Sequence, residues 1–213
     1  MDLNSKKTLQ LEKTLNNFLY AIQEHFEKNK FQQTELISNE IEKLSSVNIK
    51  SITSSKSSTC KYLERALNNI PNSLAPMRNL IKLISNNVIW YEAKRGVPYI
   101  FKGGYAFAEI VGDMGLKFSN RIRLGFFLQK PNLNYPLHAH DAKELYFILS
   151  GTADWQIEDK KFKAKPGLII HHEEKEEHAI TTSELPLFAL WIWTGNINGR
   201  YWFANNPEKD CPI

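Results

Sequence analysis

The pattern of apolar residues changes near residue 96, and this change limits the fold more than any other feature of the sequence. Before it, apolar residues recur three or four positions apart, as on one face of an amphipathic helix. This spacing is carried by Leu11, Leu15, Phe18, Ile22 and Phe26. After it, short segments rich in β-branched and aromatic residues alternate with Gly, Pro, Asn and Asp. We therefore expect a helical region over residues 1–95 and a β-domain over residues 96–213.

Four helices are expected in the first region. The spacing above defines the first helix, and Ile37, Ile41 and Leu44 continue it on a second. Residues 45–59 are rich in serine and lack periodicity, so they are expected to form a loop. Residues 62–70 and 74–91 are expected to be two further helices, because Pro71-Asn72-Ser73 interrupts the apolar pattern between them.

Several short strands are expected in the second region. They lie at residues 105–111, 121–129, 144–150, 153–158, 167–170, 178–182 and 187–194. Their spacing favours a β-sandwich or barrel. The last strand is apolar on both faces, since Trp191 and Trp193 share one face and Leu190 and Ile192 the other. One face can line the barrel, and the other needs a cover: the N-terminal helices, a second sheet, or a second chain in a homodimer.

Composition places the chain among ordinary globular proteins and argues against two kinds of partner. Hydrophobic residues make up 42% and charged residues 23% of its 213 residues. No apolar run is long enough for a membrane span, and the first residues lack the apolar core of a secretion signal. The net charge of +4 forms no basic stripe of the kind that binds nucleic acid. Cys60 and Cys211 cannot form a disulfide framework. We expect a cytoplasmic protein with a small-molecule partner.

Residues with metal-binding side chains concentrate in the β-domain. Five of the six histidines lie between positions 138 and 178. Side chains in a strand alternate between faces, so the even-numbered His138, His140, Glu144 and Tyr146 can face the same way. His178, on a later strand, can supply a third imidazole. Imidazole and carboxylate suit Zn²⁺, Fe²⁺, Mn²⁺ and Ni²⁺. The absence of a nearby cysteine cluster argues against a closed structural zinc site. We expect one divalent metal ion, whose identity stays open.

The spacing of these residues resembles the two motifs of the cupin superfamily, small β-barrels that hold one metal ion. His-x-His, three residues, Glu144, six residues and Gly151 make the first motif. Pro166-Gly167, ten residues and His178 make the second. The charged run HHEEKEEH departs from the usual proline-containing turn, and the glycine normally found five residues before the first histidine is absent. The resemblance implies a mainly β fold, with a C-terminal cupin barrel and an N-terminal α-helical extension.

Three segments narrow this resemblance to bacterial cupin-type dimethylsulfoniopropionate (DMSP) lyases. They are residues 135–146 (YPLHAHDAKELY), 149–153 (LSGTA) and 186–195 (PLFALWIWTG). The useful motifs cover residues 101–195. The resemblance implies that His140, Glu144, Tyr146 and His178 are metal ligands. It places His138 at the metal site, as a further ligand or as a neighbour of the ligands.

The reaction that the resemblance implies is a β-elimination, which converts DMSP to dimethyl sulfide, acrylate and a proton. A metal ion acidifies the carbon acid beside the carboxylate. Tyr146 is the implied base, because a nearby cation favours its phenolate, and His138 is the next candidate. Aromatic faces suit the sulfonium through cation–π attraction. The candidates for an aromatic wall that binds the sulfonium are Tyr135, Trp155, Trp191 and Trp193. Trp193 best matches the family's pocket tryptophan, whereas barrel core is the plainer interpretation of Trp155 and Trp191.

Two other functions stay open at this stage. One is an Fe(II) dioxygenase using three histidines and one glutamate, and the other is a cupin that binds a small molecule without catalysis. Tyr146 favours the lyase, because a dioxygenase needs open coordination sites more than a basic phenol. The full ligand set and the lack of a DNA-binding module disfavour a sensor. His171 and His172 precede a charged run and indicate a solvated turn, while Arg121 and Arg123 can face either solvent or the barrel mouth.

Overall fold

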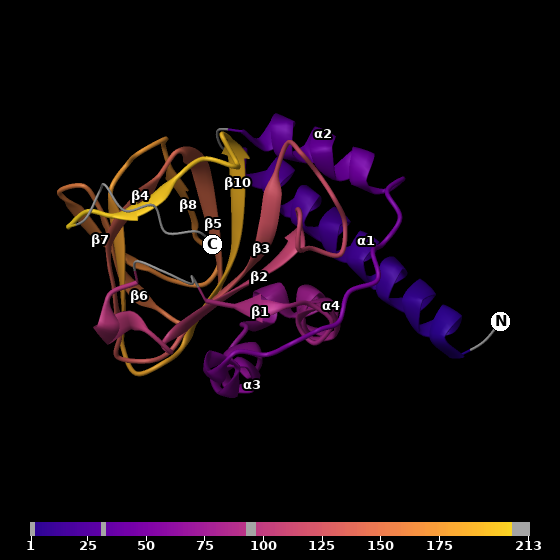
Figure 1. Ribbon diagram of the computed structural model, residues 1–213, viewed down its shortest axis with the longest axis horizontal. Helices are drawn as coiled ribbons and strands as arrows, with labels where there is room; N and C mark the ends of the chain where they lie inside the picture. The colour runs from indigo at the N-terminus through magenta and orange to yellow at the C-terminus, as the bar shows by residue number, and fades with distance from the viewer. Residues whose placement is uncertain (1–2, 31–32, 93–96, 206–213) are drawn as a thin grey trace.

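The computed structural model describes residues 3–30, 33–92 and 97–205. N-terminal helices precede two antiparallel β-sheets that face each other as a sandwich (Figure 1). This arrangement confirms the expected mainly β domain with a helical extension. The expected boundary between residues 95 and 96 lies outside the described residues, as does Cys211; Cys60 is a free thiol. Among the helices described, none has both the length and the apolar character needed to cross a membrane.

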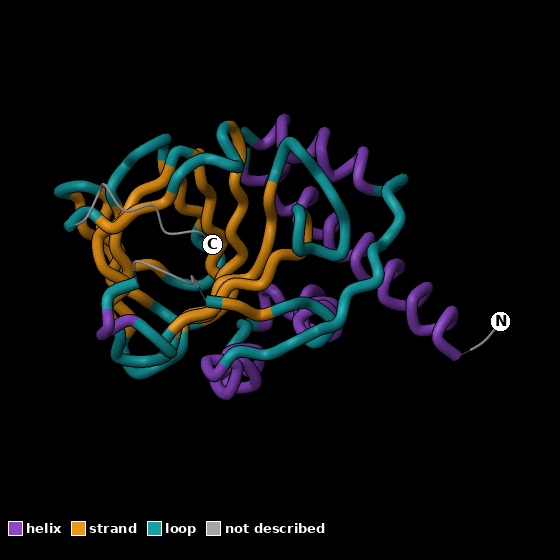
Figure 2. Tube along the Cα trace, viewed as in Figure 1, coloured by secondary structure: helices purple, strands orange, loops and turns teal. Residues whose placement is uncertain are grey.

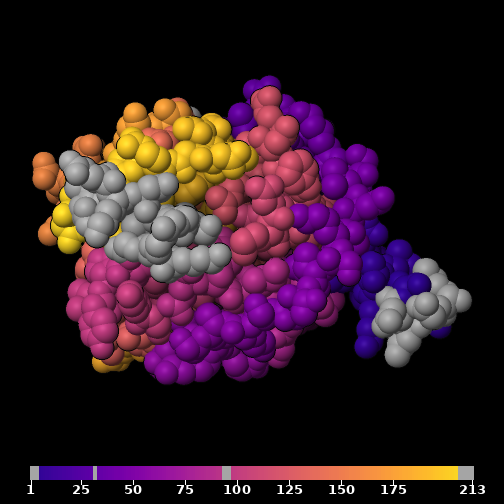
Figure 3. Space-filling view, viewed as in Figure 1, coloured from indigo at the N-terminus to yellow at the C-terminus, as the bar shows by residue number. Residues whose placement is uncertain are grey.

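The helical region follows the apolar spacing of the sequence. Its helices are α1 (Leu3–Asn29), α2 (Thr34–Leu44), α3 (Leu63–Asn68) and α4 (Ala75–Ser85), with short 3₁₀ turns at Ser58–Tyr62 and Asn72–Leu74. A third 3₁₀ turn, Tyr99–Phe101, lies at the start of the β-domain. The face of α1 that carries Leu15, Phe18, Ile22 and Phe26 is buried. The first turns of α1, drawn in indigo, project beyond the rest of the surface (Figure 3).

The last expected helix is shorter than predicted. Instead of running over residues 74–91, α4 ends at Ser85, and Trp90–Tyr91 forms strand β1. The side chains of Asn86 and Asn87 donate hydrogen bonds to the carbonyl oxygens of Lys82 (2.8 Å) and Leu83 (2.7 Å). Asparagine competes in this way with the helical hydrogen-bond pattern, and the helix ends there.

The two sheets contain all the expected strands and four more. The first sheet has the order β1-β2-β3-β10-β5-β8 and the second β11-β4-β9-β6-β7. The expected strands are β2 (Tyr105–Val111), β3 (Arg123–Gln129), β5 (Ala142–Ser150), β6 (Ala153–Ile157), β8 (Ile169–His172), β9 (His178–Thr182) and β10 (Leu187–Gly195). The additional ones are β1, β4 (Asn134–His140), β7 (Lys160–Ala164) and β11 (Tyr201–Phe203). Strand β7 is mostly charged and exposed, so it lacks the apolar alternation that identifies a strand.

The helices cover the outer face of the six-stranded sheet (Figure 2). On β10, Leu190 and Ile192 pack in the core shared with the helices, whereas Trp191 and Trp193 face the barrel interior. The doubly apolar strand is therefore covered by helices of the same chain and needs no second copy. A homodimer remains a prediction without this support.

Replacing Phe18 with alanine tests how much the helical cover contributes to stability. Phe18 is fully buried in α1, and its ring centroid lies 5.7 Å from that of Phe126 on β3. Removing such a ring from a packed core typically costs about 3–5 kcal/mol. We expect a loss of that size in the free energy of unfolding, measured by denaturant titration. Tyr20→Ala is the matched control, because Tyr20 is 48% exposed on the same helix and its loss should cost less than about 0.5 kcal/mol.

Candidate metal centre

The histidine motif spans a corner between the two sheets. Strand β4 lies in the five-stranded sheet and β5 in the six-stranded sheet, with Asp141 between them. The backbone N–H of Asp141 donates to the carbonyl of Arg200 (3.0 Å), and the N–H of Arg200 donates to Asp141 Oδ2 (2.9 Å). The chain therefore bends at Asp141, and the motif does not lie on one regular strand. The side chains converge because the two sheets face each other across the barrel.

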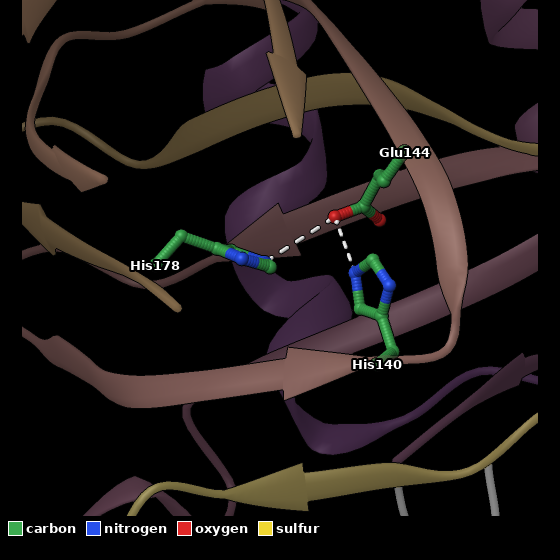
Figure 4. Close-up of side chains that lie close together, drawn as sticks. All are labelled: His140, Glu144 and His178. Carbon is green, nitrogen blue, oxygen red and sulfur yellow. Dashed lines mark hydrogen bonds and ion pairs between the residues drawn. The ribbon is translucent and has the colours of Figure 1, made fainter. Parts of the chain in front are cut away.

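Three buried side chains meet at this corner. His140 Nε2 lies 3.0 Å and His178 Nε2 3.4 Å from the same oxygen of Glu144, Oε2 (Figure 4). Their ligand atoms all lie within 4.8 Å of one another. The three side chains are 0–3% exposed. This geometry agrees with the convergence predicted for these residues, and it makes a buried group that can hold one metal ion.

The backbone fixes the tautomer of three histidines. Nδ1 of His138, His140 and His178 lies 2.8–2.9 Å from the carbonyl oxygens of Pro136, Ala142 and Glu176, respectively. A carbonyl oxygen only accepts hydrogen bonds, so each Nδ1 carries a proton and donates it. In the neutral imidazole, each Nε2 therefore presents a lone pair. This arrangement is typical of metal-binding histidines, whose second nitrogen is held by a backbone carbonyl.

The polar atoms of the centre require a positive charge among them. With Nδ1 already donating, the Nε2 lone pairs of His140 and His178 point toward the Glu144 carboxylate. His178 Nε2 is buried and has no hydrogen-bond partner among the residues that the structure describes. Burial alone would raise the pKa of Glu144, but a positive charge on His140, with the hydrogen bonds that its protonated imidazole and His172 donate, holds this pKa well below its usual range. A proton or a metal ion between these atoms would remove the repulsion between the Nε2 lone pairs and the carboxylate oxygen. Two imidazoles with a carboxylate are a suitable ligand set for a divalent ion.

His138 lies beside this group rather than within it. Its ring stacks on Tyr135, with centroids 3.9 Å apart and planes 5° apart, and its centroid is 4.1 Å from that of His178. Burial lowers the pKa of His138 well below its usual value, and the neighbouring His178 lowers it further. The Tyr135 hydroxyl lies 2.5 Å from that of Tyr201.

Tyr146 faces the cavity two residues after Glu144. Its ring packs against Phe127 and Trp155, with centroid distances of 5.8 and 5.0 Å. Burial raises the pKa of Tyr146 well above its usual value, and the negative charge of Glu144 raises it further. Without a cation beside it, the phenol is therefore neutral.

Aromatic side chains form most of the wall of the small cavity next to this group. The lining residues are Phe107, Tyr135, His138, His140, Glu144, Tyr146, Trp191, Trp193 and Tyr201. The free space holds about one water molecule, so a larger ligand requires some of these side chains to move. Of the predicted wall residues, Trp155 does not line the cavity; it packs behind Tyr146.

The two lining tryptophans are in contact with a cation and a carboxylate. The guanidinium of Arg123 lies 5.4 Å from the ring of Trp193 and 5.7 Å from that of Trp191. Arg123 also pairs with the buried Glu109 at 2.6 Å, so it faces the barrel side of the sheet. The indole N–H of Trp193 donates to Glu144 Oε1 at 2.8 Å, which ties the cavity wall to the candidate ligand.

Comparison with known proteins identifies the family. The model of the DMSP lyase family matches residues 29–189, which include most of the helical region and the metal centre. The chain belongs to the DMSP lyase family.

Two curated relatives and one solved structure illustrate the relationship. The putative DMSP lyase DddL of Cereibacter sphaeroides is 33% identical over 122 residues, which are 56% of this chain and 51% of DddL. The DMSP lyase DddQ of Ruegeria pomeroyi is 31% identical over 98 residues, 46% of this chain and 49% of DddQ. The chain thus spans about half the length of the curated relatives it matches. The crystal structure of DddQ from Ruegeria pomeroyi DSS-3 superposes with a TM-score of 0.76 at 21% identity, covering 93% of this chain and 99% of that chain. This likeness confirms the predicted cupin-like barrel.

Within this family fold, His172 is a site residue that the sequence interpretation missed. The prediction of a solvated turn was wrong, because His172 is fully buried at the end of β8 and its Nδ1 lies 3.3 Å from Glu144 Oε2. Extending the expected strand by two residues would have placed His172 on the inward face with Ile170. His171 faces the other way, and its Nε2 lies 2.7 Å from Gln33 Nε2 of the N-terminal region.

Phe107 and Tyr201 are further members of the cavity wall that sequence analysis did not single out. Phe107 comes from β2, and Tyr201 comes from β11, where it pairs with His140 of β4. Neither residue belongs to a motif. Only the pairing of distant strands brings them to the site.

Proposed function

We propose that the protein is a metal-dependent DMSP lyase, which cleaves dimethylsulfoniopropionate into dimethyl sulfide, acrylate and a proton. The observation that carries this proposal is the buried group of His140, Glu144 and His178 inside an aromatic cavity, in a chain of the DMSP lyase family. The relatives DddL and DddQ are named for the same activity, one of them as putative.

The cavity suits the two ends of this substrate differently. The sulfonium is a cation without a hydrogen-bond donor, so the lining rings of Trp191 and Trp193 attract it through their π-systems. Tyr135 also lines the cavity, but its ring is stacked on Phe101 and His138. The carboxylate belongs at the opposite end, beside the candidate ligands. No lysine or arginine lines the cavity among the described residues, so no side-chain cation competes for this carboxylate.

Tyr146 is the proposed base that removes the proton from the carbon next to the carboxylate. A divalent ion held by His140, Glu144 and His178 would offset the charge of Glu144, favour the phenolate of Tyr146 and acidify the substrate's C–H bond. The phenolate oxygen accepts the proton, the C–H electron pair forms the double bond of acrylate, and the C–S bond breaks to release dimethyl sulfide. His138, whose buried imidazole is neutral, is the second candidate base.

The proposal predicts dimethyl sulfide release that depends on bound metal and not on oxygen. Purified protein would be incubated with DMSP, and dimethyl sulfide would be measured in the headspace by gas chromatography. We expect release in air and under argon alike, loss of at least about nine-tenths of it after chelation, and recovery on adding back a divalent metal. Release that requires oxygen would favour the dioxygenase. No release by fully metallated protein would contradict the proposal.

A further inference from the structure

Glu144 accepts hydrogen bonds from a neighbour on each side. It lies on β5, between β10 and β8, and its directly paired residues are Trp193 on β10 and His172 on β8. Trp193 Nε1 donates to Oε1 at 2.8 Å, and His172 Nδ1 lies within hydrogen-bond distance of Oε2 at 3.3 Å. Each carboxylate oxygen therefore has its own neighbour on an adjacent strand.

The tautomer of His172 is set by Trp155. The indole N–H of Trp155 donates to His172 Nε2 at 3.0 Å. An indole nitrogen is only a donor, so Nε2 must be the accepting nitrogen and Nδ1 must carry the proton. His172 therefore donates to Glu144 Oε2. The side chains of Trp155, His172 and Glu144 are at most 3% exposed, so bulk water does not replace the Trp155–His172 or the His172–Glu144 hydrogen bond.

This assignment separates His172 from the other imidazoles of the site. His138, His140 and His178 donate from Nδ1 to backbone carbonyls and keep the Nε2 lone pair for the cavity. His172 has its lone pair occupied by the Trp155 indole and presents an N–H to the carboxylate. It cannot offer Nε2 to a metal while the Trp155 hydrogen bond is intact.

We propose that His172, held as the Nδ1–H tautomer by Trp155, is a positioning residue that orients Glu144 for metal binding. This inference rests on the metal centre of the proposed function. The two N–H donors, from His172 and Trp193, fix the plane of the carboxylate, so that Oε2 points to the lone pairs of His140 and His178. Hydrogen bonds that hold a ligand in this way typically affect metal affinity by about 10–100-fold.

Two substitutions of His172 test the roles of its two ring nitrogens separately. In His172→Asn, the amide nitrogen takes the place of Nδ1 and can still donate to Glu144. In His172→Gln, the amide takes the place of Nε2 and keeps a partner for Trp155, but the donor to Glu144 is lost. His171→Gln is the matched control, because His171 is the adjacent residue on β8 and contacts Gln33 rather than the centre.

The measurement is the affinity of the substrate-free protein for Zn²⁺, by competition with a chromophoric chelator. We expect His172→Gln to weaken binding about 10–100-fold, and His172→Asn and His171→Gln to stay within about threefold of the parent. The visible spectrum of the Co²⁺ form should change only in His172→Gln. Equal losses in the Asn and Gln variants, or no loss in either, would overturn the positioning role. A parent protein that binds no Zn²⁺ would instead refute the metal centre itself.

Trp155→Phe provides a second measurement if a His172 variant does not fold. It removes the donor that sets the tautomer but leaves His172 in place. His172 can then also adopt the Nε2–H tautomer, whose Nδ1 lone pair repels Glu144 Oε2. We expect Zn²⁺ affinity to fall by about threefold or more, whereas an unchanged affinity would contradict the proposed role of Trp155.

Discussion

Replacing His140 with alanine is expected to remove most of the bound metal and, with it, the proposed lyase activity. His140 presents a lone pair 3.0 Å from the Glu144 oxygen that also faces His178. Groups that only orient a ligand contribute about 10–100-fold to metal affinity, so loss of a ligand should cost at least the upper end of that range. Elemental analysis of the purified variant measures the metal, and the headspace assay measures dimethyl sulfide.

A second histidine variant controls for the loss of an imidazole as such. His171→Ala removes a partly exposed side chain on β8 that contacts Gln33 and does not line the cavity. It should keep its metal and its activity. Near-parental metal content in His140→Ala would show that His140 is not a ligand, whatever happened to the turnover.

Much of the fold was predictable because it follows from local periodicity. The spacing of Leu15, Phe18, Ile22 and Phe26 places one face of α1 in the core, and the two-sided apolar pattern of β10 requires cover on both faces. The end of α4 was not predictable from apolar spacing. It depends on side-chain hydrogen bonds from Asn86 and Asn87, which compete with the helix.

The candidate site was predictable only where its residues share a motif. His140, Glu144 and His178 stand at characteristic spacings, and the structure brings their ligand atoms together. The even-residue argument reached the right grouping, but the alternation of one strand does not explain it, because the chain turns a corner at Asp141 and the residues come from opposing sheets. His172 was missed because the charged residues that follow it indicated a solvated turn rather than an inward-facing strand position.

Tyr146→Phe is expected to lower turnover per bound metal by about 10²–10⁴-fold, the usual contribution of general acid–base catalysis. Phenylalanine keeps the ring that packs on Phe127 and Trp155 and removes only the ionisable oxygen. The variant should therefore fold, with a melting temperature close to that of the parent. Tyr91→Phe is the control, because Tyr91 packs against the same interior core but does not line the cavity.

Turnover must be divided by bound metal, because Tyr146 is also an implied ligand. If the oxygen acts only as a ligand, the loss of activity should follow the loss of metal, and the corrected turnover should stay near the parental value. A corrected ratio within about threefold of unity is less than 1 kcal/mol in the barrier and would exclude the base role. The proton would then have to be taken by another group, and His138 is the next candidate. Its Nδ1 donates to the Pro136 carbonyl, and its neutral Nε2 faces the cavity with a lone pair. In that case, His138→Gln should lower the turnover per bound metal, measured in the same way, whereas Tyr146→Phe leaves it unchanged.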